Sequence, residues 1–373
     1  MIIVPYIHEL SDWPRLRWRD DALQAQLGAV RHRQGRLIGR MEALGIDLQR
    51  EATLRVLTED VIRSSEIEGL VLDASQTRSS IARRLGMDVA GLTPSVQNID
   101  GIVDVLVDAT QFYDRKLTKR RLLAWHAALF PTGHSGIEKI IVGGWRSDRS
   151  GPMQVVSGTR RQNIHFQAPS AQSLDGEVQT FLRWFAARQD IDPVLKAGVA
   201  HFWFVTIHPF QDGNGRIARA IADMALARSE QSARRFYSMS AQIRADAKSY
   251  YNILETTQSG GLDITAWLQW FLDCLDHAFD RAEDILSAVI SKASFWERHA
   301  SAVLNERQRL VLNRLLDAFQ GKLTSSKWAA LTHSSQDTAL RDLDSLVSQG
   351  ILVKEPAGGR STNYVLARHP RAD

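Results

Sequence analysis

The chain has 373 residues, of which 44% are hydrophobic and 24% charged, as in ordinary soluble globular proteins. The formal net charge of +4 is small for this length and does not argue for nucleic-acid binding. The single cysteine, Cys274, excludes an internal disulfide framework and a multi-cysteine metal site. We expect a cytoplasmic protein, because no signal peptide and no apolar run of about 18 residues, long enough to cross a membrane, is found.

Most of the chain has the apolar periodicity of helices. This spacing predicts a helix over 20–44. It predicts a second helix over 51–68, which Gly69 would end as a C-cap. Further helices are expected over 80–88, 95–114, 118–131, 173–188, 192–207, 249–258 and 263–290.

The pattern changes in two places. Residues 143–169 are rich in Gly, Ser, Arg and β-branched residues, and two short apolar runs within them, at 153–158 and 163–166, predict a β-hairpin. From residue 301 onward, three short helices followed by a hairpin form the winged-helix pattern, with 335–350 in the place of a recognition helix. That helix holds three aspartates and one arginine, so DNA binding is less favoured than dimerisation or target docking.

The segment HPFQDGNGRIAR, residues 208–219, concentrates the parts of a phosphate site. Gly213 and Gly215 let the backbone curl and bring its N–H groups close to an anion, at the start of a helix. His208 alone could be a helix-terminal histidine that bonds a backbone carbonyl. The neighbouring N–H cradle favours a general base for an incoming hydroxyl instead.

Charged side chains flank this cradle. A carboxylate beside bound phosphate is unfavourable unless a cation lies between them, so Asp212 implies Mg²⁺. Arg216 and Arg219 stand three residues apart on the first turns of the helix and can face phosphate oxygens. A solvated arginine pair is the alternative, but it would not explain why they adjoin the glycine loop.

The segment matches, at every defined position, the signature of the Fic family, H-P-F-x-[DE]-G-N-G-R-x-x-R, and the chain resembles that family. Members transfer AMP from ATP to a Tyr, Thr or Ser hydroxyl of a protein. The resemblance therefore implies a nucleotidyltransferase that uses ATP and Mg²⁺, with auto-AMPylation as a side reaction. It implies that His208 is the general base, that Asp212 binds the metal and that Arg219 reaches the γ-phosphate. The α- and β-phosphates would be held by Gly213, Asn214, Gly215 and Arg216.

The resemblance also assigns the neighbouring segments. The hairpin would be a flap that aligns a protein target by strand addition, with Met153 and Val155 as clamps; an ordinary connecting hairpin is the alternative. Its residues are Gln154, Val155, Val156 and Ser157. Tyr250 and Tyr251 resemble the border of the nucleotide pocket, although tyrosine in a helix is more often part of the core.

A second short motif lies at the end of the predicted helix 51–68. Ser64, Glu68 and Gly69 match the inhibitory pattern of the family, [ST]-x-x-x-E-[GN]. Glu68 would pair with Arg219 and place negative charge where the γ-phosphate must lie, so that ATP binds weakly or unproductively. The alternative is a surface glutamate on a charged helix. In some relatives the same glutamate serves in removal of AMP.

The expected fold is mainly α: a Fic-type helical core with a β-hairpin flap and a C-terminal winged-helix domain. The expected domains are an N-terminal helical domain with the inhibitory helix (1–100), the catalytic core (101–275), a linker helix (276–300) and the winged-helix-like part (301–373). The expected function is an autoinhibited protein adenylyltransferase, active on an unknown protein target and homodimeric as relatives often are. The alternatives are a nucleotide-sensing DNA-binding regulator, or transfer of another nucleotide such as UMP.

Overall fold

A computed structural model describes residues 5–87, 93–149, 151–157, 163–188, 190–316, 319, 321–355 and 362–367. The chain divides into two compact units, Met1–Ile285 and Leu286–Asp373. The boundary falls within α11 (Thr265–Arg298), a continuous helix in the region where the sequence predicts a linker. Helices dominate the described residues and strands form short two-stranded sheets, so the mainly α fold class is confirmed.

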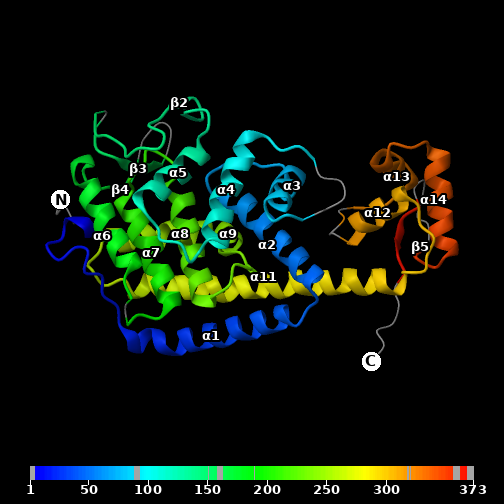
Figure 1. Ribbon diagram of the computed structural model, residues 1–373, viewed down its shortest axis with the longest axis horizontal. Helices are drawn as coiled ribbons and strands as arrows, with labels where there is room; N and C mark the ends of the chain where they lie inside the picture. The colour runs from blue at the N-terminus through cyan, green and yellow to red at the C-terminus, as the bar shows by residue number, and fades with distance from the viewer. Residues whose placement is uncertain are drawn as a thin grey trace. The chain divides into compact units, whose positions relative to one another are not determined.

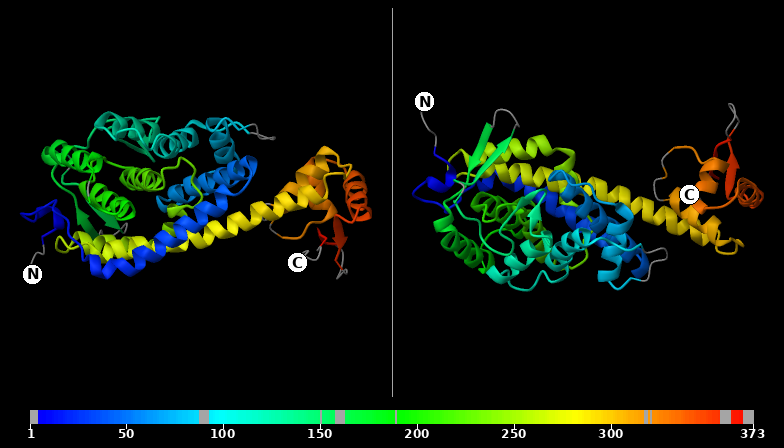
Figure 2. Two further views of the ribbon diagram at one scale, coloured as in Figure 1. Left: turned by 60° about the horizontal axis from the view of Figure 1, so that its bottom comes forward. Right: turned by 90° about the horizontal axis from the view of Figure 1, so that it is seen from above.

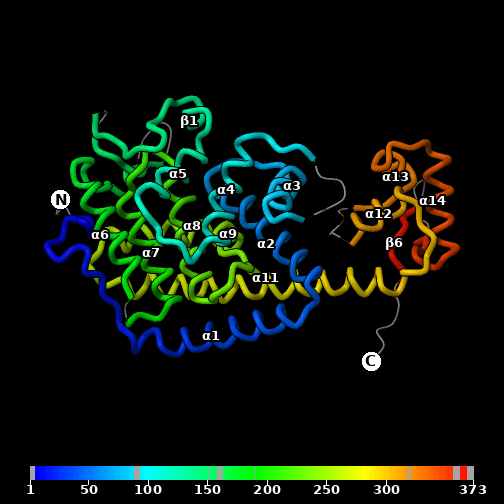
Figure 3. Tube along the Cα trace, in the orientation of Figure 1, coloured from blue at the N-terminus to red at the C-terminus, as the bar shows by residue number. Residues whose placement is uncertain are grey.

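The first unit contains most of the helices, and the course of the chain between them can be followed in Figures 1 and 3. Two short 3-10 helices accompany them, at Ile7–Glu9 and Ala171–Ser173. The α-helices before α11 are α1 (Asp20–Glu42), α2 (Ile46–Ile67), α3 (Ala74–Arg84), α4 (Gln97–Gln111), α5 (Lys119–Leu129), α6 (Leu174–Ala186), α7 (Pro193–Ile207), α8 (Asn214–Glu230), α9 (Met239–Ala245) and α10 (Ala247–Gln258).

Helices α7 and α8 form the centre of this unit. The N-terminus of α7 is capped by Asp192, which accepts a hydrogen bond from the Val194 amide at 2.7 Å, and Pro193 occupies the first turn. Nearly all of α7 is apolar and buried, as expected of a helix surrounded by others. Helix α8 packs along it with Ile217 and Ile221 fully buried. The six residues between the two helices are therefore held by two rigid elements.

Helix α2 packs against α9 and is fastened to it by a buried carboxylate. Asp60 accepts hydrogen bonds from the Ser238 hydroxyl and from the Ser240 amide. Burial raises the pKa of Asp60, while the two serines oppose that shift. This anchor lies one helical turn before Ser64 and two before Glu68, so it sets the position of the end of α2.

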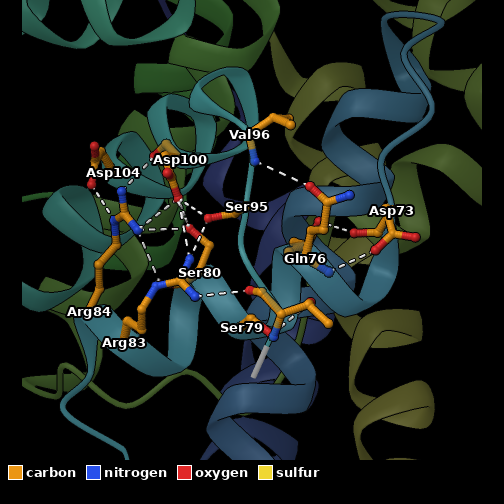
Figure 4. A network of polar contacts seen from close by, with 12 residues as sticks. Asp73, Gln76, Ser79, Ser80, Arg83, Arg84, Ser95, Val96, Asp100 and Asp104 are labelled. Atoms are coloured by element: carbon orange, nitrogen blue, oxygen red, sulfur yellow. Dashed lines mark hydrogen bonds and ion pairs between the residues drawn. The ribbon is translucent and has the colours of Figure 1, made fainter. Parts of the chain in front are cut away.

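Helix α3 is tied to α4 by a polar network (Figure 4). The Asp100 carboxylate accepts hydrogen bonds from Ser80 at 2.5 Å, Ser95 at 2.7 Å and Arg84 at 3.2 Å. Arg84 also bonds Asp104. These contacts hold the helices that follow α2 in sequence and thereby support its C-terminal end.

Helices α1 and α11 run side by side in the same direction over the first unit (Figure 2). The pairs Gln26–Asp273, Arg33–Asp280 and Arg36–Glu283 share one sequence offset, as a parallel arrangement requires. No helix among the described residues is long and apolar enough to cross a membrane.

Two short antiparallel hairpins complete the first unit. Strands β1 (His134–Ser135) and β2 (Glu138–Lys139) form one, and β3 (Gln154–Ser157) and β4 (Asn163–Gln167) form the hairpin that the sequence predicts. Val155 is opposite Phe166 but Val156 is opposite Ile164, which leaves His165 as the extra residue of a β-bulge.

The second unit has its own core. Helices α12 (Glu306–Leu316), α13 (Ser325–Thr332) and α14 (Gln336–Ser348) precede strands β5 (Leu352–Lys354) and β6 (Tyr364–Leu366), in the predicted order. Asp342 of α14 is buried and accepts hydrogen bonds from Nε and Nη2 of Arg307, at 2.8 and 3.1 Å. The core includes Phe295, Val311, Leu312, Leu323, Trp328, Leu343, Leu346 and Leu352.

Candidate functional site

The turn between α7 and α8 presents His208 at its first position. Its backbone is left-handed, with φ 51° and ψ 57°, which is uncommon for a residue with a side chain. Its Nδ1 lies 3.1 Å from the Val205 carbonyl oxygen and donates to it. The neutral ring is then the tautomer with a free lone pair on Nε2, as a general base requires. His208 is half-buried and lines the cavity described below.

The electrostatic surroundings favour the neutral form of His208. Burial lowers its pKa from 6.5 to about 4, and the positive charge of Arg146 acts in the same direction. The Val205 hydrogen bond and the carboxylates of Glu68 and Asp212 oppose this shift without cancelling it. The imidazole is therefore unprotonated at neutral pH and able to accept a proton.

Arg146 braces this turn, a role that sequence reasoning missed. Its buried guanidinium donates to the carbonyl oxygens of His208, at 2.7 Å, and Pro169, at 2.5 Å, and pairs with Asp148 at 3.0 Å. Its backbone amide also donates to the carbonyl oxygen of Pro209, at 3.0 Å. Arg146 thus joins the left-handed turn to the chain that leaves β4.

His126 supports the turn from α5 and was also missed. Its ring stacks on Phe210, with centroids 4.1 Å apart and planes 6° apart. Nδ1 accepts from the Gly143 amide at 3.1 Å, so Nε2 carries the proton and donates to the Asp212 carbonyl oxygen at 3.2 Å. Only its place in the amphipathic helix 118–131 was visible in the sequence.

The Asn214 side chain, which the resemblance assigns to the phosphates, lies against the backbone of the turn. Its Oδ1 accepts from the Phe210 amide at 3.0 Å, and its Nδ2 donates to the Phe210 carbonyl oxygen at 2.8 Å. The side chain is buried and ties the turn to itself. Both ends of the amide serve the loop, because the turn must satisfy the backbone groups of Phe210.

The glycines of the turn are required by close contacts. Gly213 has φ +82°, and a Cβ there would lie 2.9 Å from the Phe130 ring. A Cβ on Gly215 would lie 2.4 Å from Oε1 of Glu68. Because the first N–H groups of α8 have no partner within the helix, the turn forms a site for an anion.

Asp212 lies beside this anion site. Its side chain is 39% exposed, accepts from the Gly213 amide at 2.5 Å and is bonded by the Ser135 hydroxyl. Among the described residues no cluster of three or more His, Cys, Asp or Glu is placed to hold a metal ion. The partly exposed Asp212 carboxylate is a hard oxygen ligand of the kind that Mg²⁺ binds.

Glu68 and Arg219 form an ion pair across 151 positions of the sequence. Arg219 Nη2 lies 2.7 Å from Glu68 Oε1. Arg219 also donates two hydrogen bonds to Ser64, from Nε to the hydroxyl oxygen at 2.9 Å and from Nη2 to the carbonyl oxygen at 3.0 Å. Burial lowers the pKa of Arg219, but Glu68 together with Tyr250 and Tyr251 opposes this effect, and the net shift is upward. Glu68, at the end of α2, thus lies directly beside Gly215.

Two buried nitrogen atoms at the site, Nε of Arg216 and Nη1 of Arg219, have no hydrogen-bond partner in the part of the chain that the structure describes. Arg216 stacks over the Phe130 ring at 4.9 Å and lies 4.0 Å from Asp212. Unpaired buried cationic nitrogens are costly. An anionic ligand would satisfy them.

A cavity of about 600 Å³ joins these parts. Helix α8, the hairpin, α10 and the end of α2 all contribute to its walls. Arg216 lines a second cavity of about 650 Å³ instead, which Glu68 and Asp212 border as well. The first cavity brings together the predicted residues Glu68, Met153, Gln154, Val155, Val156, Ser157, His208, Asp212, Gly213, Asn214, Gly215, Arg219, Tyr250 and Tyr251.

The two tyrosines of α10 differ in exposure. Tyr250 is buried, and its hydroxyl pairs with Nε2 of His201 at 2.9 Å, so only part of its ring borders the cavity. Tyr251 is 47% exposed, and its hydroxyl approaches the Ile67 carbonyl oxygen at 3.4 Å. Tyr251 is therefore the more accessible of the two and touches the end of α2.

Comparison with known families accounts for the arrangement. The profile of the Fic/DOC family matches residues 116–226, which include the whole turn and most of α8. The chain contains a Fic/DOC family domain. Residues 6–87, which include α2 and Glu68, match a domain of unknown function, DUF4172.

Curated relatives of the Fic domain are distant. Protein adenylyltransferase Fic of Aedes aegypti is 24% identical over 235 residues, covering 60% of this chain and 41% of the relative. The protein of the same name from Drosophila melanogaster is 24% identical over 242 residues, covering 62% and 43%. The chain thus spans less than half the length of these relatives.

Solved structures share the Fic fold. A Fic family protein from Desulfovibrio desulfuricans aligns with a TM-score of 0.54 at 19% identity, covering 96% of this chain and all of that one. A Fic domain containing signaling protein from Bacteroides thetaiotaomicron aligns with a TM-score of 0.52 at 18% identity, covering 69% and 96%. At this identity the likeness concerns the fold alone.

Proposed function

We propose that the protein is an autoinhibited protein adenylyltransferase, which transfers AMP from ATP to a hydroxyl of a protein target. One observation carries the proposal: a neutral histidine, a glycine anion site, a buried arginine and a strand edge line one cavity, and Glu68 holds that arginine. The Fic/DOC family match and the names of the distant relatives support the same reaction.

In this mechanism the turn binds the triphosphate. The N–H groups at the start of α8 and Arg216 would hold the α- and β-phosphates, and Arg219 would offer its unpaired Nη1 to the γ-phosphate. Asn214 keeps the loop in shape. Asp212 would hold Mg²⁺ together with phosphate oxygens, and the ion would neutralise charge on the leaving pyrophosphate.

His208 would act on the target hydroxyl. Its Nε2 takes the proton as the hydroxyl oxygen attacks the α-phosphorus, and pyrophosphate leaves. The edge of β3 would align the target backbone, and Met153 and Val155 would clamp it. Arg146 keeps the ring in place from behind.

Glu68 would prevent productive ATP binding. Its Oε1 lies 2.4 Å from the position that a Cβ on Gly215 would take, at the start of α8. It also neutralises Arg219, so a γ-phosphate loses its cation and meets a like charge. Activation would require the end of α2 to release Arg219.

Incorporation of labelled ATP into proteins of a cell lysate tests the proposal. Glu68→Gly should raise incorporation by about tenfold or more, since a buried ion pair no longer competes and each ~1.4 kcal/mol is a factor of ten. Adding His208→Ala should reduce the transfer about 100-fold or more. Competition by unlabelled ATP, UTP, GTP and CTP would identify the base.

Glu66→Gly is the matched control. Glu66 lies in the last turn of the same helix and pairs with Arg63 at 2.8 Å, away from Arg219. It should leave incorporation at the wild-type level. Equal, low incorporation in wild type and Glu68→Gly would contradict autoinhibition.

A further inference from the structure

The flap contains a hydrogen-bonded relay that ends on a hydroxyl. Ser157, at the end of β3, lies with its Oγ 2.6 Å from Nε2 of His165 on β4. Nδ1 of His165 lies 2.8 Å from Oε2 of Glu255 on α10. All three residues line the cavity that contains His208 and the anion site.

The orientation of the relay fixes the direction of proton transfer. A carboxylate only accepts hydrogen bonds, so Nδ1 of His165 carries a proton and donates a hydrogen bond to Glu255. In the neutral ring Nε2 then has a lone pair and accepts the hydrogen bond of the Ser157 hydroxyl. A serine, an imidazole and an orienting carboxylate in this order make the serine oxygen nucleophilic.

Strand register accounts for this arrangement. Ser157 pairs with Asn163, and His165 lies two residues further along β4, so His165 shares a face of the hairpin with Ser157 and lies diagonal to it. The register shift between Val155 and Val156 leaves His165 without a paired residue on β3. The ring contacts both Ser157 and Glu255, while Val156 and Ile164 remain exposed. A fastening role alone would need only the His165–Glu255 contact and not the serine.

We propose that Ser157 is an acceptor of AMP within the chain itself, with His165 as its base and Glu255 as the residue that positions His165. The proposal rests on the adenylyltransferase function proposed above. Ser157 Oγ would form a bond to the α-phosphorus of ATP while the bond from that phosphorus to the bridging oxygen breaks. Pyrophosphate leaves, and the hydroxyl proton passes to Nε2 of His165.

The proton can then leave the site, because about one third of the His165 side chain is exposed to water. The product is an AMP ester on the flap. Because Ser157 belongs to the strand on which a target would dock, this ester would obstruct the docking edge. Self-modification at Ser157 would thus limit activity when no target covers the flap.

Peptide mapping by mass spectrometry tests the assignment. The full chain carrying Glu68→Gly is incubated with ATP and Mg²⁺, and the peptide containing Ser157 should gain the mass of one AMP. In the same background His165→Asn should slow this gain about 100-fold, and Glu255→Gln should slow it less, because Gln still accepts the hydrogen bond from Nδ1. Ser157→Thr should retain an adduct at this position, and Ser157→Ala should lose it.

Ser173→Ala is the matched control, since that hydroxyl donates to the Ser170 carbonyl oxygen at 2.9 Å instead of to a histidine. It should retain the Ser157 adduct. AMP on lysate proteins or on other residues, with Ser157 unmodified, would overturn this inference and leave the transferase standing. An adduct that persists unchanged in His165→Asn would overturn the relay. No label on any protein would overturn the proposed function itself.

Discussion

At the scale of residues, the site depends on histidine side chains whose pKa values are lowered. His208, His126 and His201 are all held neutral, chiefly by burial, with pKa values lowered to about 4, 4 and 3. Of these three, only His208 borders the cavity of the candidate site. His126 and His201 instead use their ring nitrogens to support Asp212 and Tyr250.

The lowered pKa of His208 predicts the pH profile. In the Glu68→Gly variant, kcat/KM for ATP-dependent transfer should stay level from neutral pH down past 6.5 and fall only as pH approaches about 4, where the base becomes protonated. Loss of Glu68 removes a charge that raises this pKa, so the variant should not shift the fall to higher pH. A half-maximal rate near pH 6.5 would contradict the assignment of His208 as a buried base.

At the scale of elements, the reactive turn is stabilised by contacts from outside the two helices that it joins. Arg146 reaches His208 over 62 positions and binds the end of the flap as well. His126 packs beneath the turn from α5. The left-handed backbone at His208 persists because these neighbours hold it.

Replacing Arg146 should therefore affect stability and transfer together. Arg146→Met removes charge-assisted hydrogen bonds to three buried or half-buried acceptors and should lower the free energy of unfolding by about 2 kcal/mol or more. In the Glu68→Gly background, Arg146→Met should also lower kcat while it changes KM little, because His208 is misplaced while the anion site remains. Urea unfolding and labelled-ATP incorporation measure the two effects.

Arg149→Met serves as the control for this change, because Arg149 is exposed on the same loop. It should alter the free energy of unfolding by no more than about 0.5 kcal/mol. Transfer that survives in Arg146→Met at the level of the Arg149 variant would contradict the brace.

At the scale of the whole molecule, each of the two units has its own buried core. The second is built around Trp328, which is fully buried, and around leucines of α12 and α14. The predicted catalytic residues and the inhibitory glutamate all belong to the first unit. Catalysis and its inhibition should therefore be independent of the second core.

Trp328→Ala tests this independence. Truncating a buried tryptophan costs about 3–5 kcal/mol, which should unfold the second unit or lower its melting temperature alone. Calorimetry should show one shifted transition and one unchanged. Incorporation of labelled ATP in the Glu68→Gly background should remain within about twofold. A common shift of both transitions would show that the units unfold as one.

The sequence by itself determined the mainly helical fold, the hairpin and the twelve-residue motif 208–219. These features are local: apolar periodicity sets the helices, and the residues of the turn are adjacent in the chain, so their chemistry is readable without a fold. The pairing of Glu68 with Arg219 was predicted from two family motifs, and the structure places the two side chains in contact.

The tertiary structure alone decided which side chains support this chemistry. Arg146 and the His165–Glu255 contact join residues 62 and 90 positions from their partners, and no periodicity records such pairings. The extra residue in β4 depends on the strand register of the folded hairpin, which the alternation of residues in the sequence does not reveal. The resemblance assigns Asn214 to the phosphates, and only the folded turn shows that its side chain also bonds the backbone of Phe210.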